Sequence, residues 1–432
     1  MNSIWRKEIE KPKFETLSGD AKTDVLIIGG GIVGILCAHF LKQSGINCML
    51  LEANEICSGA TKNTTAKITF QHGAIYDKMI KRFGVEPARL YFEAQQDALE
   101  TYRALCEDIP CDFETSDAYV YSRYDREKIE KEVEAYGKIG CDAEFTKDTE
   151  LPFSVAGAVK VGKQAQFHPL KFLYAISKDL PIFEHTKVTE FVKPNVVSTS
   201  RGKIRAEKII VATHFPLLNK HGGYFLKLYQ HRSYVLALKN TPEIHGMYVD
   251  EDEKGLSFRN ANDLLLLGGG SHRTGKKGGN WDELSNFAKT FYKDAKEVAR
   301  WAAQDCMPLD DIPYIGQYSK KTPSLFVVTG FHKWGMTSAM TAATLLCDLI
   351  LEKENPYEEI FSPSRSILRP QLAFNTAESL LGLLTPTAPR CPHLGCALKY
   401  NKQEHSWDCS CHGSRFTEDG EVIDNPSTDD LK

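Results

Sequence analysis

The stretch Asp24-Val-Leu-Ile-Ile-Gly-Gly-Gly-Ile-Val-Gly34 decides the fold of this 432-residue chain. Its apolar run ends in three glycines, a helical pattern follows up to Gly45, and a second apolar run covers residues 47–51. This order predicts a strand, a tight turn, a helix and a second strand, which together form a βαβ unit. The N-terminus of the helix over residues 32–44 would present free N–H groups and a positive dipole end to bound phosphates.

The glycines fit G-x-G-x-x-G, a pattern typical of dinucleotide-binding turns. Gly29 allows the tight turn out of the strand, Gly31 lets the backbone approach a pyrophosphate, and Gly34 lets the helix pack closely on the strand. Glu52, at the end of the second strand, is placed to bind ribose hydroxyls. The motif alone leaves FAD and NAD both open, and a glycine-rich turn without a ligand is the structural alternative.

Length and charge exclude several classes of protein. A chain of 432 residues is too long for one compact core, so two or three domains are expected. A net charge of -4 and the lack of a basic stretch argue against nucleic-acid binding. Residues 1–17 hold no apolar run that would form a signal peptide, and the apolar stretch 342–351 is too short to span a bilayer. We therefore expect a cytoplasmic protein that is not an integral membrane protein.

Four segments after Glu52 agree in order and spacing with a known family: Cys57-Ser-Gly-Ala-Thr61, Thr186-Lys-Val188, Asp311-Ile-Pro-Tyr-Ile-Gly316 and Gly330-Phe-His-Lys-Trp-Gly-Met-Thr337. With the glycine-rich turn, they make residues 20–355 resemble the D-amino-acid-oxidase-like superfamily, which includes glycine oxidase and sarcosine oxidase. The resemblance implies FAD as the cofactor. It assigns to cofactor binding Ser58, Gly59, Thr61, Val188, Gly316, Gly330, Gly335, Met336 and Thr337.

The segment from Gly330 to Thr337 also makes physical sense by itself. A buried strand ends at Gly330, and Gly335 opens a helix of small residues. Small side chains let a flat ring lie close, and the helix dipole can stabilise negative charge on a reduced flavin. A tightly packed strand–turn–helix without a ligand is the alternative.

Cysteines and histidines crowd into two boxes near the C-terminus, Cys391-Pro-His393-Leu-Gly-Cys396 and Cys409-Ser-Cys411-His412-Gly-Ser414. The boxes resemble those of the Rieske iron–sulfur family. Thiolates from Cys391 and Cys409 would hold one iron of a [2Fe–2S] cluster, and neutral imidazoles from His393 and His412 would hold the other. The resemblance also implies a disulfide between Cys396 and Cys411. Zinc is the alternative metal for such a quartet.

A complete Rieske domain carries further β-strands before its first box, whereas only a proline-rich stretch precedes Cys391. We therefore expect a truncated module, over residues 387–432, that docks on the flavin domain for support. Residues 362–386 are expected to be a linker.

Together the two resemblances predict the fold class. It is an α/β (α+β) two-domain flavoprotein with a Rossmann-like FAD-binding domain, an antiparallel-sheet substrate domain and a small all-β cluster module. The oxidoreductase part covers residues 20–361. Its FAD-binding parts lie at about 20–75, 155–220 and 305–355, and its substrate domain at about 76–154 and 221–304.

The first resemblance implies oxidation of a C–H bond next to an amine or a hydroxyl, with hydride transfer to the flavin. A substrate carboxylate would need a buried arginine, because the planar guanidinium binds both oxygens. Arg259, Arg232 and Lys333 are the candidate catalytic residues, and Tyr234 and His272 are further candidates. A solvated or salt-bridged side chain is the alternative for each. His332 is interpreted as a packed loop residue, and Cys306 as a buried free thiol or a covalent tether of the flavin.

Our leading hypothesis is an enzyme in which a small-molecule substrate reduces FAD and the cluster removes the electrons one at a time. The acceptor would be a redox protein or a quinone. The first alternative is an electron-transfer flavoprotein without an organic substrate of its own. The second is a redox sensor in which the cofactors only signal or stabilise.

Overall fold

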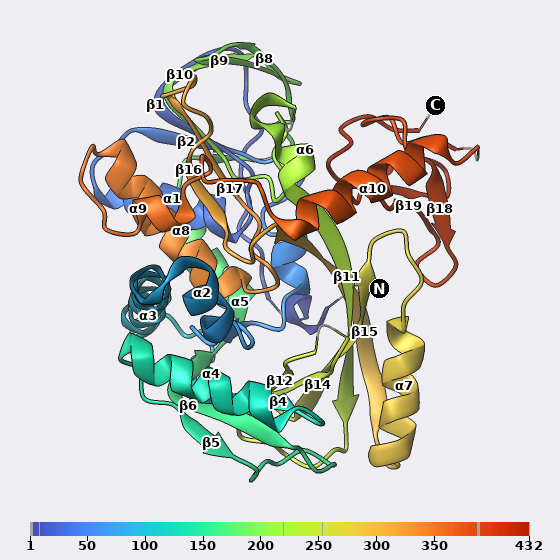
Figure 1. Cartoon of the computed structure of the whole chain (residues 1–432). Helices are drawn as coiled ribbons and strands as arrows, with labels where there is room; N and C mark the ends of the chain where they lie inside the picture. The colour runs from blue at the N-terminus through green and yellow to red at the C-terminus, as the bar shows by residue number, and fades with distance from the viewer. Residues whose placement is uncertain (1–2, 8, 219, 253, 387–388, 432) are drawn as a thin grey trace.

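The computed structural model describes residues 3–7, 9–218, 220–252, 254–386 and 389–431. Three β-sheets organise this part of the chain, and helices cover the two larger sheets (Figure 1). None of the helices within the described ranges is both long and apolar enough to cross a membrane. The predicted combination of an α/β domain, a second sheet domain and a small all-β module is confirmed.

The first sheet has eight strands in the described residues and holds the βαβ unit. Strand β1 (Ala21–Ile28) lies parallel between β10 (Lys203–Val211) and β2 (Cys48–Leu51), and α1 (Ile32–Gln43) connects β1 to β2. Leu26 and Ile27 are fully buried because helices and loops cover both faces of the sheet, as in other parallel sheets. The other strands are β7 (Ile182–Phe183), β8 (Val188–Lys193), β9 (Val196–Thr199), β16 (Tyr314–Gln317) and β17 (Leu325–Thr329).

Helix α8 (Gly335–Ile350) follows β17 and packs beside α1 under this sheet (Figure 1). The helix of small residues expected to open at Gly335 is therefore present. Helices α2 (Tyr76–Phe83) and α3 (Val85–Cys106) are separated at Gly84, which has a φ of 94°. Only glycine adopts such a backbone conformation readily.

The second sheet has nine strands in the described residues and is antiparallel except for the β4–β12 pair. Helices α4 (Arg126–Ile139) and α7 (Asn280–Phe291) lie on it (Figure 1). Asp125 caps α4 by accepting a hydrogen bond from the Lys128 backbone N–H at 3.0 Å. The strands are β3 (Lys67–Ile68), β4 (Glu114–Ser122), β5 (Glu144–Thr146), β6 (Gly157–Gln166), β11 (Leu228–Lys239), β12 (Met247–Asp250), β13 (Ser257–Ala261), β14 (Leu264–Arg273) and β15 (Lys296–Pro308).

Three strands of this sheet cross the predicted domain boundaries. Strand β3 pairs with β6, although residues 20–75 were expected in the FAD-binding part. Strand β6 pairs with β4 in the second sheet, although residues 155–166 were expected in the FAD-binding part. Strand β15 continues to Pro308 and so passes the expected boundary at residue 305. Its last residues thereby reach the first sheet, and one continuous strand connects the two domains.

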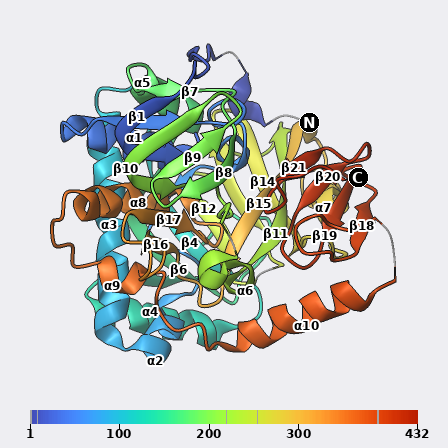
Figure 2. The same cartoon turned by 90° about the horizontal axis from the view of Figure 1, so that it is seen from above.

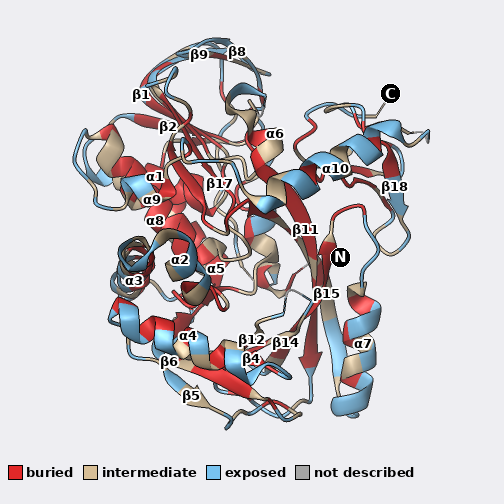
Figure 3. Cartoon of the chain, in the orientation of Figure 1, coloured by how far each residue is buried: buried red, intermediate tan, exposed pale blue. Residues whose placement is uncertain are grey.

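The third sheet belongs to the C-terminal module and contains β18 (Leu398–Asn401), β19 (Ser406–Cys409), β20 (Arg415–Thr417) and β21 (Val422–Asp424). Helix α10 (Pro370–Leu384) fills most of the segment that the sequence analysis expected to be a linker. Proline at its first position is compatible with a helix start, because that N–H needs no intrahelical partner. Figure 2 shows α10 running along the module, and Figure 3 shows that much of its surface is exposed.

The remaining helices are short. They are α5 (Pro169–Ser177), α6 (Tyr224–Lys227), α9 (Glu358–Phe361) and three 3-10 turns at Ile4–Arg6, Ala60–Asn63 and His221–Gly223.

Candidate functional site

The glycine-rich turn has the geometry that a bound pyrophosphate requires. Gly29 has a φ of 113°, and a Cβ atom there would lie 2.6 Å from the Ala212 carbonyl oxygen. A Cβ atom on Gly34 would collide with the Gly29 carbonyl oxygen, which explains why helix α1 and strand β1 need glycine at this crossing. The Glu52 carboxylate accepts a hydrogen bond from the Gly30 backbone N–H at 2.8 Å, so the acid predicted to bind ribose is fixed beside the turn.

A cavity of about 980 Å³ opens at this turn and extends across the face of both larger sheets. Its size and shape fit an extended dinucleotide, since residues from the β1–α1 turn, the loop after β2 and the start of α8 all line it. Ten of the predicted cofactor-binding residues lie on its wall: Gly29, Gly31, Glu52, Ser58, Gly59, Thr61, Val188, Gly330, Gly335 and Met336.

Three predicted cofactor-binding residues do not line this cavity. Gly34 serves the helix–strand contact described above. Gly316 lies on β16, where a Cβ atom would meet Pro363 at 3.3 Å, so the residue belongs to the sheet edge. Thr337 turns away from the cavity, because its hydroxyl donates a hydrogen bond to the Thr69 carbonyl at 3.0 Å.

The loop between β17 and α8 lines the cavity, and its backbone is strained. His332 and Lys333 are consecutive non-glycine residues with positive φ angles of 47° and 70°. Such conformations cost about 1 kcal/mol or more each and concentrate at functional sites. Trp334 stacks on the buried His72 with the two ring centroids 5.1 Å apart. Burial lowers the pKa of His332, so its imidazole is kept neutral.

The three candidate catalytic residues have different surroundings. Lys333 lines the cavity, and its Nζ donates to the Ser271 hydroxyl at 3.3 Å. Arg232 also lines the cavity, but it forms a buried ion pair with Glu404 of the C-terminal module. Arg259 does not line it.

The Arg259 guanidinium is occupied by backbone groups. Its Nη1 donates to the carbonyl oxygens of Thr65 at 2.7 Å and Ala66 at 2.9 Å. These contacts fix the chain that leads into β3, and they leave no bidentate face for a substrate carboxylate. Arg259 was a candidate because a buried arginine can bind a carboxylate, but its guanidinium binds the chain before β3 instead.

The secondary candidates are also held by protein contacts. The Tyr234 hydroxyl lies 3.1 Å from His272 Nε2 and donates to Glu404 at 2.8 Å. Cys306 lines the cavity and is buried, with its sulfur 3.5 Å from the Thr329 hydroxyl oxygen. Burial raises the pKa of Cys306 to about 12, as expected for an unreactive thiol.

Several cavity residues were missed by the sequence analysis. Ser233, Ser271 and Asp305 line the cavity beside Lys333, and Lys67 lines it from β3. Burial, with a smaller effect of the nearby Arg259, lowers the pKa of Lys67 to about 7. Of these four residues, only Asp305 could have been found from the sequence, because it is adjacent to Cys306. Ser233, Ser271 and Lys67 come from strands that are far apart along the chain.

The four predicted cluster ligands form two close pairs in the C-terminal module, His393 with His412 and Cys391 with Cys409. The His393 and His412 rings have centroids 5.0 Å apart, and both thiols of the quartet, Cys391 and Cys409, are buried. His412 Nδ1 is buried without a hydrogen-bond partner among the described residues, as expected for a nitrogen reserved for a metal. Burial lowers the pKa of His393 to about 4 and that of His412 to about 3, which keeps both imidazoles neutral.

The two ligand loops are built alike. The Gly395 backbone N–H donates to the Cys391 carbonyl, and the Gly413 N–H donates to the Cys409 carbonyl, both at 2.9 Å. Both glycines have positive φ angles, 79° and 90°, so each loop turns sharply around the site. A disulfide between Cys396 and Cys411 joins the loops, as the Rieske resemblance implied. Two thiols and two neutral imidazoles in this arrangement fit a [2Fe–2S] cluster of the Rieske type.

Three side chains of the second sheet hold the ligand loops directly. Gln304 Nε2 donates to the Gly413 carbonyl at 2.8 Å, and Gln230 Nε2 donates to the His412 carbonyl at 3.2 Å. Arg273 donates to the carbonyl oxygens of Ser410 at 3.0 Å and Cys411 at 3.1 Å. The cluster loops are thus fastened to β11, β14 and β15, the strands that also line the cavity.

A buried charge network completes the contact between the module and the second sheet. The Glu404 carboxylate accepts from Arg232 Nε at 3.0 Å and from Arg415 Nη2 at 2.9 Å, and Arg415 Nε donates to Asp408 at 3.0 Å. All four of these side chains are at most 8% exposed. The module therefore depends on the oxidoreductase domain for the burial of its charged groups, which is the docking expected for a truncated Rieske module.

Comparisons with known proteins agree with both sites. The family model described as FAD dependent oxidoreductase matches residues 24–349, and the Rieske [2Fe-2S] domain model matches residues 378–432. The second match begins inside α10, so part of the expected linker is included in the domain.

Individual proteins resemble the chain over most of its length. It is 37% identical, over 495 aligned positions, to the "Putative Rieske 2Fe-2S iron-sulfur protein YhfW" of Bacillus subtilis (strain 168), with 100% of this chain and 97% of that protein covered. It is 24% identical to gamma-glutamylputrescine oxidoreductase of Escherichia coli (strain K12), with 78% and 85% covered.

Among solved structures, the glycine oxidase from Geobacillus kaustophilus has a TM-score of 0.68 at 18% identity, with 80% of this chain and 99% of that chain covered. The L-proline dehydrogenase from P. horikoshii has the same TM-score of 0.68 at 18% identity, with 81% and 98% covered. These likenesses concern the fold. Since the family model spans residues 24–349 and the C-terminal boxes match a model of their own, the chain belongs to the FAD-dependent oxidoreductase family of the D-amino-acid-oxidase type and carries a Rieske [2Fe–2S] domain at its C-terminus.

Proposed function

We propose that this oxidoreductase removes a hydride from the carbon next to the nitrogen of a small amine or amino-acid-like substrate, or next to a hydroxyl, and releases the electrons singly from its Rieske domain. When bound, FAD supplies a two-electron hydride acceptor and the [2Fe–2S] cluster supplies a one-electron carrier. The final acceptor lies outside the chain and would be a redox protein or a quinone. The substrate class follows the relatives, which include gamma-glutamylputrescine oxidoreductase and glycine oxidase.

One observation carries the electron-splitting part of this proposal: the same cavity is lined by both domains. Its wall includes Gly29 and Gly335 of the dinucleotide site and also Arg415, Asp424 and Asn425 of the Rieske domain. Within strand β15, Gln304 holds the cluster loop at Gly413, and the next residues line the flavin side.

A path of covalent bonds with a single hydrogen bond joins His412 to the cavity wall at Cys306. It runs from His412 to Gly413, crosses the hydrogen bond to the Gln304 side chain, and continues along β15 to Cys306. A short bonded connection of this kind favours electron exchange between two sites, and it supports a joint function for the two domains.

The test is anaerobic mixing of the oxidised holoprotein with a panel of amino acids, primary amines, polyamines and hydroxy acids. Flavin bleaching reports substrate oxidation, and an EPR signal of the reduced Rieske cluster reports arrival of an electron there. A substrate that bleaches the flavin and then produces the EPR signal supports the proposal.

A variant separates the two halves of the proposal. His412→Ala should abolish the EPR signal and slow electron delivery to ferricyanide by at least about tenfold, because the cluster loses a ligand. His405→Ala, a change at an exposed histidine of the same domain, is the matched control. If no compound of the panel bleaches the flavin while dithionite reduces both cofactors, the electron-transfer flavoprotein without an organic substrate replaces the proposed enzyme.

A further inference from the structure

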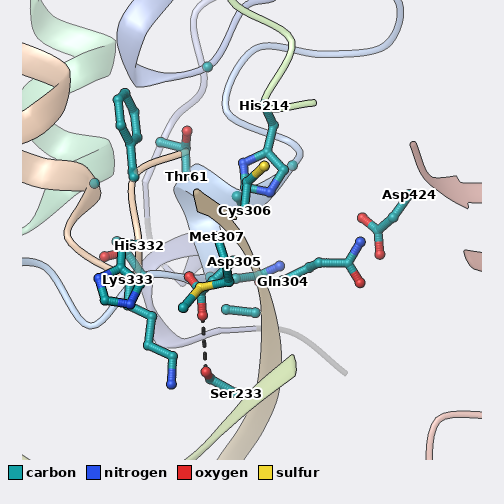
Figure 4. A pocket seen from close by; sticks show the side chains of 18 of the residues that line it. Thr61, His214, Ser233, Gln304, Asp305, Cys306, Met307, His332, Lys333 and Asp424 are labelled. Carbon is teal, nitrogen blue, oxygen red and sulfur yellow. Dashed lines mark hydrogen bonds between the residues drawn. The ribbon is translucent and has the colours of Figure 1, made fainter. Parts of the chain in front are cut away.

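Four side chains on the cavity wall form a continuous chain of hydrogen bonds. Lys333 Nζ lies 3.3 Å from Ser271 Oγ, Ser271 Oγ lies 3.3 Å from Ser233 Oγ, and Ser233 Oγ lies 3.0 Å from Asp305 Oδ2. The residues come from four separate places: the loop before α8, β14, β11 and β15. Figure 4 shows Lys333 extending towards Ser233 and the contact from Ser233 to Asp305.

The chemistry at its two ends gives this chain one direction. An ammonium group can only donate hydrogen bonds, and an ionised carboxylate can only accept them. The Lys333 ammonium therefore donates to Ser271. The Ser271 hydroxyl donates to Ser233, and Ser233 donates to Asp305. Each of the three hydrogen bonds uses a different hydrogen atom, so all three can form at the same time.

We propose that Lys333, Ser271, Ser233 and Asp305 form a proton relay that carries the proton lost by the substrate ammonium group from the cavity to Asp305. The relay rests on the proposed function in one respect, which is that the substrate is an amine. Hydride loss from the carbon requires a nitrogen lone pair, so a bound ammonium ion must first lose one N–H proton.

The proton balance is simple. Lys333 passes one N–H proton to Ser271, each serine passes on its own hydroxyl proton as it receives another, and the Asp305 carboxylate gains one proton. Lys333 is then neutral and accepts the proton of the substrate ammonium. In total the substrate nitrogen loses one proton and Asp305 gains one. The lysine and both serines regain their starting protonation, and the two hydroxyls rotate to restore the original direction of the chain.

The position of Lys333 supports this role over that of a surface lysine. Its φ angle of 70° is strained for a residue with a side chain, and the strain places the residue on the cavity wall. All four members line the cavity, so the relay starts where a substrate would lie.

Other titratable groups surround the relay and belong in any analysis of its pH dependence. The neighbouring His332 interacts with Lys333 and also with Asp311, His231 and Lys78. His214 interacts with both Asp305 and Asp424, and the carboxylate of Asp305 opposes the lowering of the His214 pKa by burial.

The first test needs no substrate. The oxidised holoprotein is labelled with acetic anhydride at one fixed pH, and the extent of Lys333 acetylation is read by mass spectrometry. In Asp305→Asn the accepting end of the hydrogen-bond chain is lost, so Lys333 Nζ is held less firmly by Ser271 and its labelling should rise at least about threefold.

Ser233→Ala and Ser271→Ala should raise the labelling of Lys333 in the same way, because each breaks the chain. Ser257→Ala, which removes a cavity-lining hydroxyl outside the chain, is the control and should leave the labelling unchanged. If either serine variant behaves like the control, the four groups are not coupled and the relay is overturned, whatever the substrate is.

The second test uses an amine that bleaches the flavin in the panel described above. Ser233→Ala should slow bleaching at least about tenfold below the pKa of that amine, since general acid–base steps contribute about 10² to 10⁴ in rate. The loss should vanish above that pKa, where the amine arrives neutral. A loss that is equal at all pH values would show a merely structural effect and would overturn the relay. Failure of the whole panel would count against the proposed function and would leave the labelling result to decide the coupling.

Discussion

The buried ion pair between Glu404 and Arg232 gives the sharpest prediction about how the two domains are joined. Burial by itself would raise the pKa of Glu404, but the positive charges of Arg232 and Arg415 outweigh it and lower the pKa from 4.5 to about 2. A carboxyl with a lowered folded-state pKa stabilises the folded protein above its unfolded-state pKa. That stability is lost as the pH falls from about 4.5 towards 2.

The size of the effect follows from the two pKa values. At about 1.4 kcal/mol per pH unit, the difference between 4.5 and about 2 corresponds to about 3 kcal/mol. The side chain is 8% exposed, so solvent screening reduces this figure little. Removing one partner of a buried pair costs about 3–5 kcal/mol in other proteins, which agrees with this value.

We therefore expect Glu404→Gln to destabilise the docked Rieske domain by about 3 kcal/mol at pH 7. The assay is urea denaturation of the holoprotein, with cluster absorbance reporting the Rieske domain and flavin fluorescence reporting the other domain. The cluster transition should move to lower urea in the variant. In the wild type the same transition should move to lower urea as the pH falls below about 4.5.

Glu418→Gln is the matched control, because Glu418 lies in the same domain but its side chain is 55% exposed and its partner His405 is also on the surface. Because solvent screens an exposed pair, the urea midpoint of this variant should match that of the wild type. Equal shifts for the two variants would refute the reasoning, since they would show that the buried pair contributes no more than a surface pair.

Three further predictions concern single contacts. Gly34→Ala should lower the FAD content of the purified protein at least about tenfold, because its Cβ would collide with the Gly29 carbonyl oxygen; flavin absorbance per chain measures this, and normal occupancy would contradict it. Cys411→Ser should destabilise the Rieske domain by about 3 kcal/mol, since the disulfide spans a sequence separation of 15; urea denaturation under non-reducing conditions tests it, and an unchanged midpoint would count against it. Arg259→Gln should lower the stability of the oxidoreductase domain by about 2 kcal/mol through its lost contacts to backbone carbonyls; a variant of normal thermal stability whose substrate KM alone increases would restore Arg259 as a substrate ligand.

Local patterns were enough to predict both cofactor sites. The glycine-rich turn could be predicted because its requirements are local: Gly29 needs a positive φ, and Gly34 lies in contact with Gly29. The boxes around Cys391 and Cys409 could be predicted because ligand chemistry restricts residue types within a few positions. The helix α10 was missed because the proline-rich stretch before Cys391 suggested a linker, whereas the first turn of a helix accepts a proline such as Pro370.

The sequence by itself indicated the fold class, FAD and [2Fe–2S] as cofactors, and the disulfide partners through its resemblance to two known families. Tertiary structure alone decided how the side chains around the cavity are used. Arg232 meets Glu404 across 172 residues, Lys333 meets Ser271 across 62, and Ser233 meets Asp305 across 72. The physical reason is that these contacts depend on strand register and on which face of each strand points into the cavity. A change of register by one residue would turn every side chain to the other face, so only the folded sheet can show which groups meet.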